Sequence, residues 1–188
     1  MLMRAVVSDE VIEERRRLGL DRRDEMWEGV LHMIPPAFSE HNEVASDLGG
    51  VLGRQAMCHG LRRFSEPGIF DPAISDMTSY RVPDLGYARP GDVSERGIEG
   101  RAVLAVEVLS PRDKSYEKLS FYKRVGVEEL LYVDPRTRAF EVRRPDGHGW
   151  VLVGAEEDGW TPVVGLGVRL RSRDGRLQVL TDLGAEEV

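Results

Sequence analysis

The stretch RAVLAVEVLS, residues 101–110, decides the fold because its side chains are apolar on both faces of one strand. Such a strand is typical of the centre of a sheet that other elements cover on each side. Glu107 interrupts this apolar run, and burying a carboxylate is costly unless the group is paired. The sequence therefore predicts a central strand over about 102–109 and a cationic partner for Glu107.

The following segment, PRDKSYEKLSFYKRVGV, offers that partner. It predicts a helix over about 114–125 that Gly126 stops. On a helical wheel at about 100° per residue, Lys118 falls within the apolar arc that contains Tyr122 and Val125. Lys118 is therefore expected to point toward the sheet and to meet Glu107. A structural ion pair and a chemical role are equally consistent with this pair taken alone.

A second carboxylate favours a chemical role for this pair over a purely structural one. Asp84 follows Val82-Pro83 at the start of a neighbouring predicted strand. Two carboxylates on adjacent strands, a strand carbonyl and a lysine suit a divalent ion such as Mg²⁺, which prefers oxygen ligands and keeps several waters. Such an ion lowers the pKa of water and neutralises charge on a phosphate.

The rest of the chain indicates one α/β layer with antiparallel additions. A helix is expected from Ser8 to a stop at Gly19, and a second over about 40–59 with Ser39 as its cap. Strands are expected over 27–34 and 128–135, with irregular structure over 61–80 and a loop over 95–100. Turn signals at 146–147, 158–159 and 174–175, each an Asp-Gly pair, predict short β segments near the C-terminus.

Composition narrows the classes of protein to which this chain can belong. The 188 residues are expected to form a single domain, 1–188, and no window approaches the roughly 18 apolar residues of a membrane span. The net charge of −7 argues against a protein that coats nucleic acid, although a nuclease with a local basic rim remains possible. The one cysteine, Cys58, excludes an internal disulfide and indicates a cytoplasmic protein.

The order of the motifs resembles a known family. VPDLGYA at 82–88, LAVEVLSP at 104–111 and a lysine-bearing helix before LLYVDP at 130–135 are similar to the PD-(D/E)XK nuclease motif. They are closer still to the Uma-type restriction endonucleases, whose glycine-containing strand and histidine match WEGVLHMIPPAFSEHNEV at 27–44. The resemblance covers about residues 10–145 and leaves 146–188 as a C-terminal β extension. It implies a restriction-endonuclease-like mixed sheet flanked by helices, with additional antiparallel strands.

The resemblance also implies a site. Asp84 and Glu107 would be the metal carboxylates, the carbonyl of Val108 a further ligand, and Mg²⁺ or Mn²⁺ the ion. The superfamily motif has lysine where this chain has Leu109, and the position that matches the family's displaced lysine is Lys118. The catalytic residues would be Asp84, Glu107 and Lys118.

These residues imply a metal-dependent DNA endonuclease that hydrolyses phosphodiester bonds. The alternative is a catalytically inactive nuclease-fold module for binding or regulation. A homodimer is expected, because cutting both strands of a duplex needs two sites and small nucleases commonly associate. His41 would either contact the substrate or metal surroundings or serve a structural role at its helix start. Glu40 and Glu43 flank it. Members of the superfamily often place an acid on this helix, but such residues are more often simply favourable acids in a first helical turn.

Overall fold

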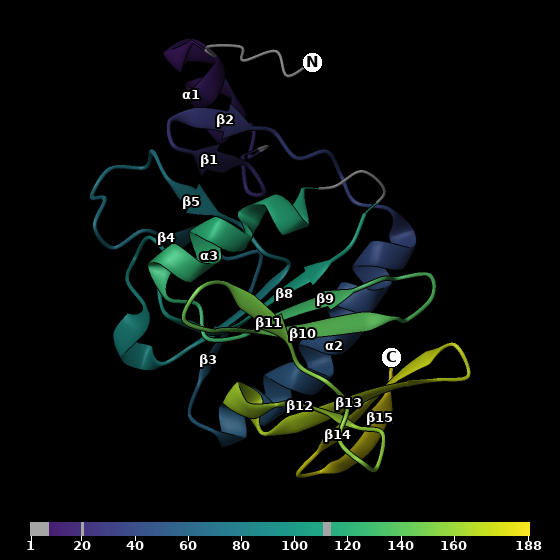
Figure 1. Cartoon of the computed structure of the whole chain (residues 1–188). Helices are drawn as coiled ribbons and strands as arrows, with labels where there is room; N and C mark the ends of the chain where they lie inside the picture. The colour runs from purple at the N-terminus through teal and green to yellow at the C-terminus, as the bar shows by residue number, and fades with distance from the viewer. Residues whose placement is uncertain (1–7, 20, 111–113) are drawn as a thin grey trace.

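The computed structural model describes residues 8–19, 21–110 and 114–188 (Figure 1). Within these residues three α-helices accompany three β-sheets: α1 (Asp9–Arg17), α2 (Ser39–Cys58) and α3 (Leu119–Val125). The expected helix from Ser8 is confirmed as α1, and Gly19 lies just beyond it with a φ of 65°. None of the described helices is long and apolar enough to span a bilayer.

A six-stranded sheet forms the centre, in the order β11-β10-β9-β8-β6-β3. Its strands are β3 (Arg62–Ser65), β6 (Leu85–Ala88), β8 (Ala102–Val108), β9 (Leu130–Val133), β10 (Phe140–Pro145) and β11 (Trp150–Leu152). β8 and β9 run parallel, and the other pairs are antiparallel. All seven residues of β8 are buried, which confirms the predicted central strand. Pro111, expected to help end this strand, lies outside the described residues.

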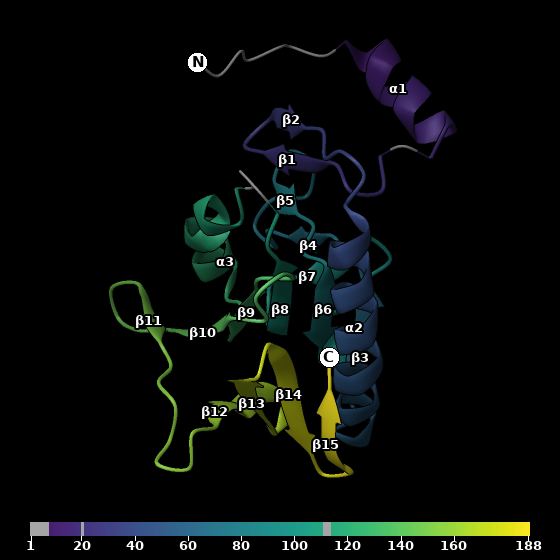
Figure 2. The same ribbon diagram turned by 90° about the vertical axis from the view of Figure 1, so that its right-hand side faces the viewer.

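The two faces of this sheet carry different layers. Leu104 and Val106 pack in the cluster that holds the apolar stripe of α2 and the inner side chains of the C-terminal sheet. Ala105 packs instead with the apolar side chains of α3 and with Tyr132. The alternation along β8 thus places α2 and α3 on opposite faces, as Figure 2 shows. Mixed sheets with helices on both faces confirm the predicted fold class.

The expected single strand over 27–34 is wrong. The chain forms a hairpin of β1 (Glu25–Trp27) and β2 (Val30–His32), which pair antiparallel. Glu28 and Gly29 connect them with φ values of 47° and 83°, the two positive angles of a tight hairpin turn. The hairpin belongs to a five-stranded sheet with β4 (Ile69–Phe70), β5 (Tyr80–Arg81) and β7 (Ile98–Glu99), so the loop expected over 95–100 contains a short strand.

Two helix starts also differ from expectation. Ser39 is the first residue of α2, and its neighbour Phe38 occupies the cap position without a side-chain hydrogen bond. The helix expected over 114–125 begins as a 3₁₀ turn, Ser115–Lys118, before α3. Gly126 ends α3 in the left-handed conformation, at a φ of 89°, as predicted.

The Asp-Gly signals near the C-terminus mark turns, as expected. The C-terminal sheet contains β12 (Thr161–Val163), β13 (Val168–Arg173), β14 (Arg176–Thr181) and β15 (Gly184–Glu187), all antiparallel. Asp174 and Gly175 connect β13 to β14 with positive φ values of 53° and 74°. Further 3₁₀ turns cover Pro90–Asp92 and Val164–Leu166.

Candidate active site

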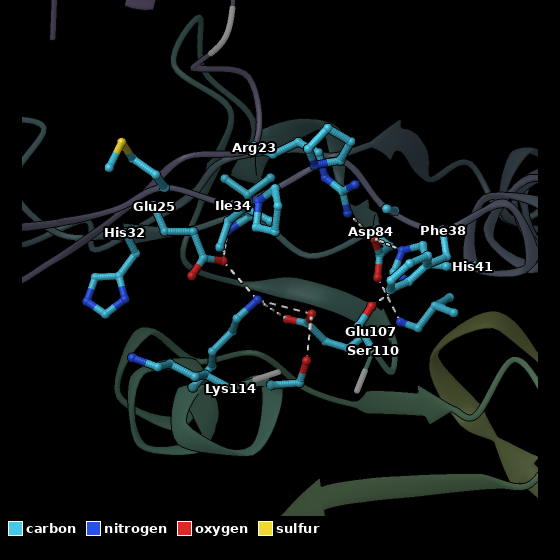
Figure 3. Close-up of a pocket in the computed structure, with 18 of the residues that line it drawn as sticks. Arg23, Glu25, His32, Ile34, Phe38, His41, Asp84, Glu107, Ser110 and Lys114 are labelled. Carbon is cyan, nitrogen blue, oxygen red and sulfur yellow. Dashed lines mark hydrogen bonds and ion pairs between the residues drawn. The ribbon is translucent and has the colours of Figure 1, made fainter. Parts of the chain in front are cut away.

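A cavity of about 430 Å³ lies where the end of β8 meets the start of β6. Asp84, Glu107 and Lys118 all line it, together with Val108 (Figure 3). The pairing of the two strands explains this meeting, because Leu85 is the register partner of Val106 and each site carboxylate is the next residue outward. The structure therefore brings the four residues that the sequence singled out into one place.

Glu107 is held by a dense set of donors. It is 3% exposed, and Lys118 Nζ lies 3.0 and 3.1 Å from its two carboxylate oxygens. Tyr122 donates its hydroxyl at 2.5 Å, and Ser115 donates at 3.4 Å. The 3₁₀ turn explains two of these contacts, because residues three apart lie on one side of such a turn. The predicted lysine–glutamate pair is thus present.

A third buried carboxylate, Glu25, was missed by the sequence analysis. It lies on β1, is 1% exposed and forms an ion pair with Lys118, whose Nζ lies 2.8 Å from its Oε1. Trp27 Nε1 and the backbone N–H of Val82 also donate to it, at 2.7 and 2.8 Å. Its local sequence, DEMWEG, is not an apolar run, so nothing near Glu25 in the chain indicates that it is buried.

The charges around Lys118 shift its pKa and that of Glu107. Burial raises the pKa of Glu107 to about 7, and the negative charges of Asp84 and Glu25 add to this effect while Lys118 opposes it. Burial alone would lower the pKa of Lys118, but Glu107 and Glu25 raise it above its usual value. Lys118 therefore stays charged between carboxylates that repel one another.

Asp84 lies across the cavity from Glu25 and has its own set of hydrogen-bond donors (Figure 3). Its Oδ1 accepts from His41 Nε2 at 2.8 Å and from Arg23 Nη2 at 3.0 Å. Its Oδ2 accepts the backbone N–H of Val108 at 2.7 Å. His41 Nδ1 lies 3.2 Å from Ser110 Oγ, so both ring nitrogens have a partner that fixes the ring beside Asp84.

The acids that flank His41 lie elsewhere. Glu40 and Glu43 are exposed and are not among the residues that line the cavity. Glu40 lies 3.6 Å from Arg136 on the surface. These positions favour neither acid as part of the site, and Glu40 lies in the first turn of α2, where an acid is favourable.

The donor set fits a divalent ion with few protein ligands. Among the residues that the structure describes, no group of three or more histidine, cysteine, aspartate or glutamate side chains is arranged to hold a metal. Two carboxylates nevertheless line one cavity, and Oδ2 of Asp84, which accepts the Val108 N–H, can bind once more. Each oxygen of Glu107 already has two donors, so Glu107 would hold an ion in place of one of them. The N–H and C=O of one strand residue point to the same side, so the carbonyl of Val108 faces Asp84. Hard oxygen donors of this number suit Mg²⁺.

Comparisons with known proteins agree with the architecture. A family model described as "Uma2: Putative restriction endonuclease" matches residues 12–174. A crystal structure described as that of a putative nuclease belonging to DUF820, from Anabaena variabilis, superposes with a TM-score of 0.60 at 19% identity, covering 77% of this chain and 83% of that one. Among curated proteins none matches the chain. The fold is thus shared with a protein described as a putative nuclease, and because the family model spans most of its length, the chain belongs to the Uma2 family, which is described as "Putative restriction endonuclease".

Proposed function

We propose that the chain is a metal-dependent DNA endonuclease that hydrolyses phosphodiester bonds with water. The observation that carries this proposal is the cavity in which Asp84 and Glu107 face each other and Lys118 pairs with Glu107. Asp84, Glu107 and the carbonyl of Val108 would hold Mg²⁺, or Mn²⁺ in its place. Such an ion supplies Lewis-acid chemistry, by lowering the pKa of water and neutralising charge on a phosphate.

The side chains of the cavity have separate tasks in this proposal. Lys118, anchored by Glu107 and Glu25, presents a fixed ammonium that stabilises the negative charge developing on the phosphate. His41 keeps the Asp84 carboxylate oriented. Glu107 has a pKa of about 7 in the described state, and a cation beside it would favour its charged form.

The wider setting remains part of the same proposal. DNA is the substrate, and a homodimer would supply one site for each strand of a duplex. The exposed free thiol of Cys58 supports a reducing cytoplasm as the place of action.

The same contacts support a second candidate, an inactive binding or regulatory module. Glu107 already accepts from Lys118, Tyr122 and Ser115, as a purely structural network would. The net charge of −7 also weakens general attraction to DNA.

Cleavage assays separate the two candidates. Wild type is expected to cut single-stranded, double-stranded or branched DNA with Mg²⁺ or Mn²⁺, and EDTA should abolish the reaction. Glu107→Gln keeps the shape of the side chain and removes its charge, so activity should collapse while circular dichroism shows an intact fold. The module is favoured instead if wild type cuts none of these substrates and Glu107→Gln unfolds.

A further inference from the structure

One wall of the cavity is apolar and exposed. Met33, Ile34 and Phe38 line it, and their side chains are 54%, 37% and 69% exposed. They come from the segment between β2 and α2, which also contributes Pro35 and Pro36 to the lining. Large apolar side chains left exposed together beside polar groups mark a binding surface.

The hairpin places a pair of stacked rings at the other end of the cavity from Phe38 (Figure 3). Trp27 and His32 stack with ring centroids 4.3 Å apart and planes 15° apart, and both line the cavity. Burial, and then the charge of Lys114, lower the pKa of His32, so its ring is neutral near pH 7. Lys114 Nζ lies 5.9 Å from the centroid of Trp27, at the same end of the cavity. Arg81 also lies over the Trp27 ring, 4.3 Å from its centroid, so at this end the ring of His32 is the one left for a base, with the cation of Lys114 nearby.

Between these two ends the cavity is deep. Asp84 and Glu107 are 7% and 3% exposed, so a phosphate must enter the recess to reach them. Double-stranded DNA is stiff over about 150 base pairs and keeps its bases stacked inside, whereas a single strand bends and exposes its bases. A cavity of about 430 Å³ has the size of a site for one small molecule, such as a nucleotide.

We propose that this cavity takes an unpaired DNA strand, with one base against Phe38, a further base against the ring of His32 at the other end, and the phosphate between them beside Asp84 and Glu107 (Figure 3). This inference rests on the proposed function and names its substrate class, single-stranded or locally opened DNA. Stacking on aromatic rings is independent of base identity, because every base has a π-face. Lys114 and Arg23, which also line the cavity, contact the flanking phosphates.

Binding tests the wall without any cleavage. The full chain is titrated, with Ca²⁺ in place of Mg²⁺ so that the carboxylates do not face the phosphate unneutralised, into fluorescently labelled oligothymidylate, and anisotropy gives the affinity. Phe38→Ala is expected to weaken binding about tenfold, and Phe38→Tyr to retain it. Leu183→Ala is the matched control, since Leu183 is 67% exposed on the turn between β14 and β15 at the far end of the molecule (Figure 1).

Several results overturn the assignment. Equal affinity of wild type and Phe38→Ala for the oligonucleotide removes the wall from the binding site. Tighter binding of the duplex or of single-stranded RNA, with the same loss in Phe38→Ala, assigns the wall to a different nucleic acid. A concentration-dependent dimer of wild type that dissociates in Phe38→Ala assigns it to a second copy of the chain.

Cleavage then separates this inference from the proposed function. Three substrates of one sequence are compared with Mg²⁺: single strand, full duplex, and duplex with a single-stranded gap. The first and third are expected to be cut at least about tenfold faster than the full duplex, and Phe38→Ala should remove this preference. Metal-dependent cutting of the full duplex at an equal rate contradicts the inference and leaves the proposed function standing. Phe38-dependent binding of the single strand without any cutting supports the binding site inferred here and contradicts the proposed catalytic function.

Discussion

Two buried glutamates, Glu107 and Glu129, lie near the centre of the same sheet and differ in their surroundings. Each is 3% exposed, Glu107 in β8 and Glu129 directly before β9. Glu129 accepts from Arg144 Nε at 2.6 Å and from the backbone N–H groups of Val164 and Gly165 at 3.1 and 2.6 Å. It is not among the residues that line the cavity, whereas Glu107 is.

We infer from this difference which glutamate is structural and which one the proposed chemistry would use. Glu129 has one cation and two fixed amides, and it ties the turn before β13 to the central sheet. Gly165 permits this close approach, because a Cβ there would lie 2.5 Å from Val103 Cγ1. Glu107 instead faces two further carboxylates, Asp84 and Glu25, whose charges add to the effect of burial and raise its pKa. Both glutamates have several donors, so the surplus negative charge at the cavity is the difference that would suit a cation from outside the chain.

The largest effect is expected from replacing Glu107. Glu107→Gln should lower the cleavage rate on the order of 10³-fold, because an ion that contributes several kcal/mol loses a ligand. The melting temperature should be unchanged or raised, since one of three mutually repelling carboxylates is gone. Single-turnover kinetics and thermal unfolding measure both, with Glu141→Gln on β10 as a surface control. If Glu107→Gln unfolds, Glu107 has a structural role like that of Glu129.

Lys118 comes next. Lys118→Ala should lower turnover about 10²-fold while changing metal affinity less, because the ammonium acts on charge that develops during the reaction. Lys118→Arg should not restore the rate, since a planar guanidinium cannot replace a compact ammonium between Glu25 and Glu107. Turnover and metal titration are compared for each folded variant. A rate in Lys118→Arg equal to wild type would reduce Lys118 to a structural counter-charge.

Glu129 provides the structural side of the comparison. Glu129→Gln should lower the free energy of unfolding by about 2 kcal/mol, because the hydrogen bonds of Arg144 and Gly165 lose their charged acceptor. The rate of DNA cleavage by the folded protein should stay at the wild-type value. Urea denaturation and cleavage assays measure the two quantities. Loss of activity in a folded Glu129→Gln would break the distinction drawn between the two glutamates.

Glu25 is expected to have the smallest effect. Glu25→Gln removes one of the two anionic partners of Lys118 and leaves the other, so the ammonium should be less well positioned. Turnover should fall about tenfold, with a smaller change in metal affinity. Wild-type turnover in this variant would show that Glu107 alone positions the lysine.

The sequence predicted the parts of this site that follow from local periodicity. The apolar run of β8 identified the central strand and the misplaced carboxylate in it, and the helical wheel pointed Lys118 toward that carboxylate. The 3₁₀ start of this helix and the hairpin at Glu28-Gly29 were missed, because each depends on a few backbone angles that periodicity does not report. Glu25 could not be found, since its burial arises from contacts with Val82 and Lys118, far along the chain.

The same limit applies to Glu129. In the sequence it reads as one of two acids before an apolar strand, and its burial depends on a C-terminal turn that docks more than thirty residues later. The partners of Asp84 are equally distant, since Arg23 and His41 reach it from two other segments. Sequence periodicity predicts which face of an element a side chain lies on. Neighbours from distant parts of the chain decide whether that side chain is enclosed by partners or lines a cavity.

Metal titration calorimetry tests the central claim most directly. Mn²⁺ or Mg²⁺ is titrated into wild type, Asp84→Asn and Glu129→Gln, all without DNA. Wild type and Glu129→Gln are expected to bind the ion with the same weak affinity, as an open site of few protein ligands does, and Asp84→Asn should lose that binding. Equal binding by wild type and Asp84→Asn would contradict the account, because the ion would then lie away from the cavity that Asp84 and Glu107 share.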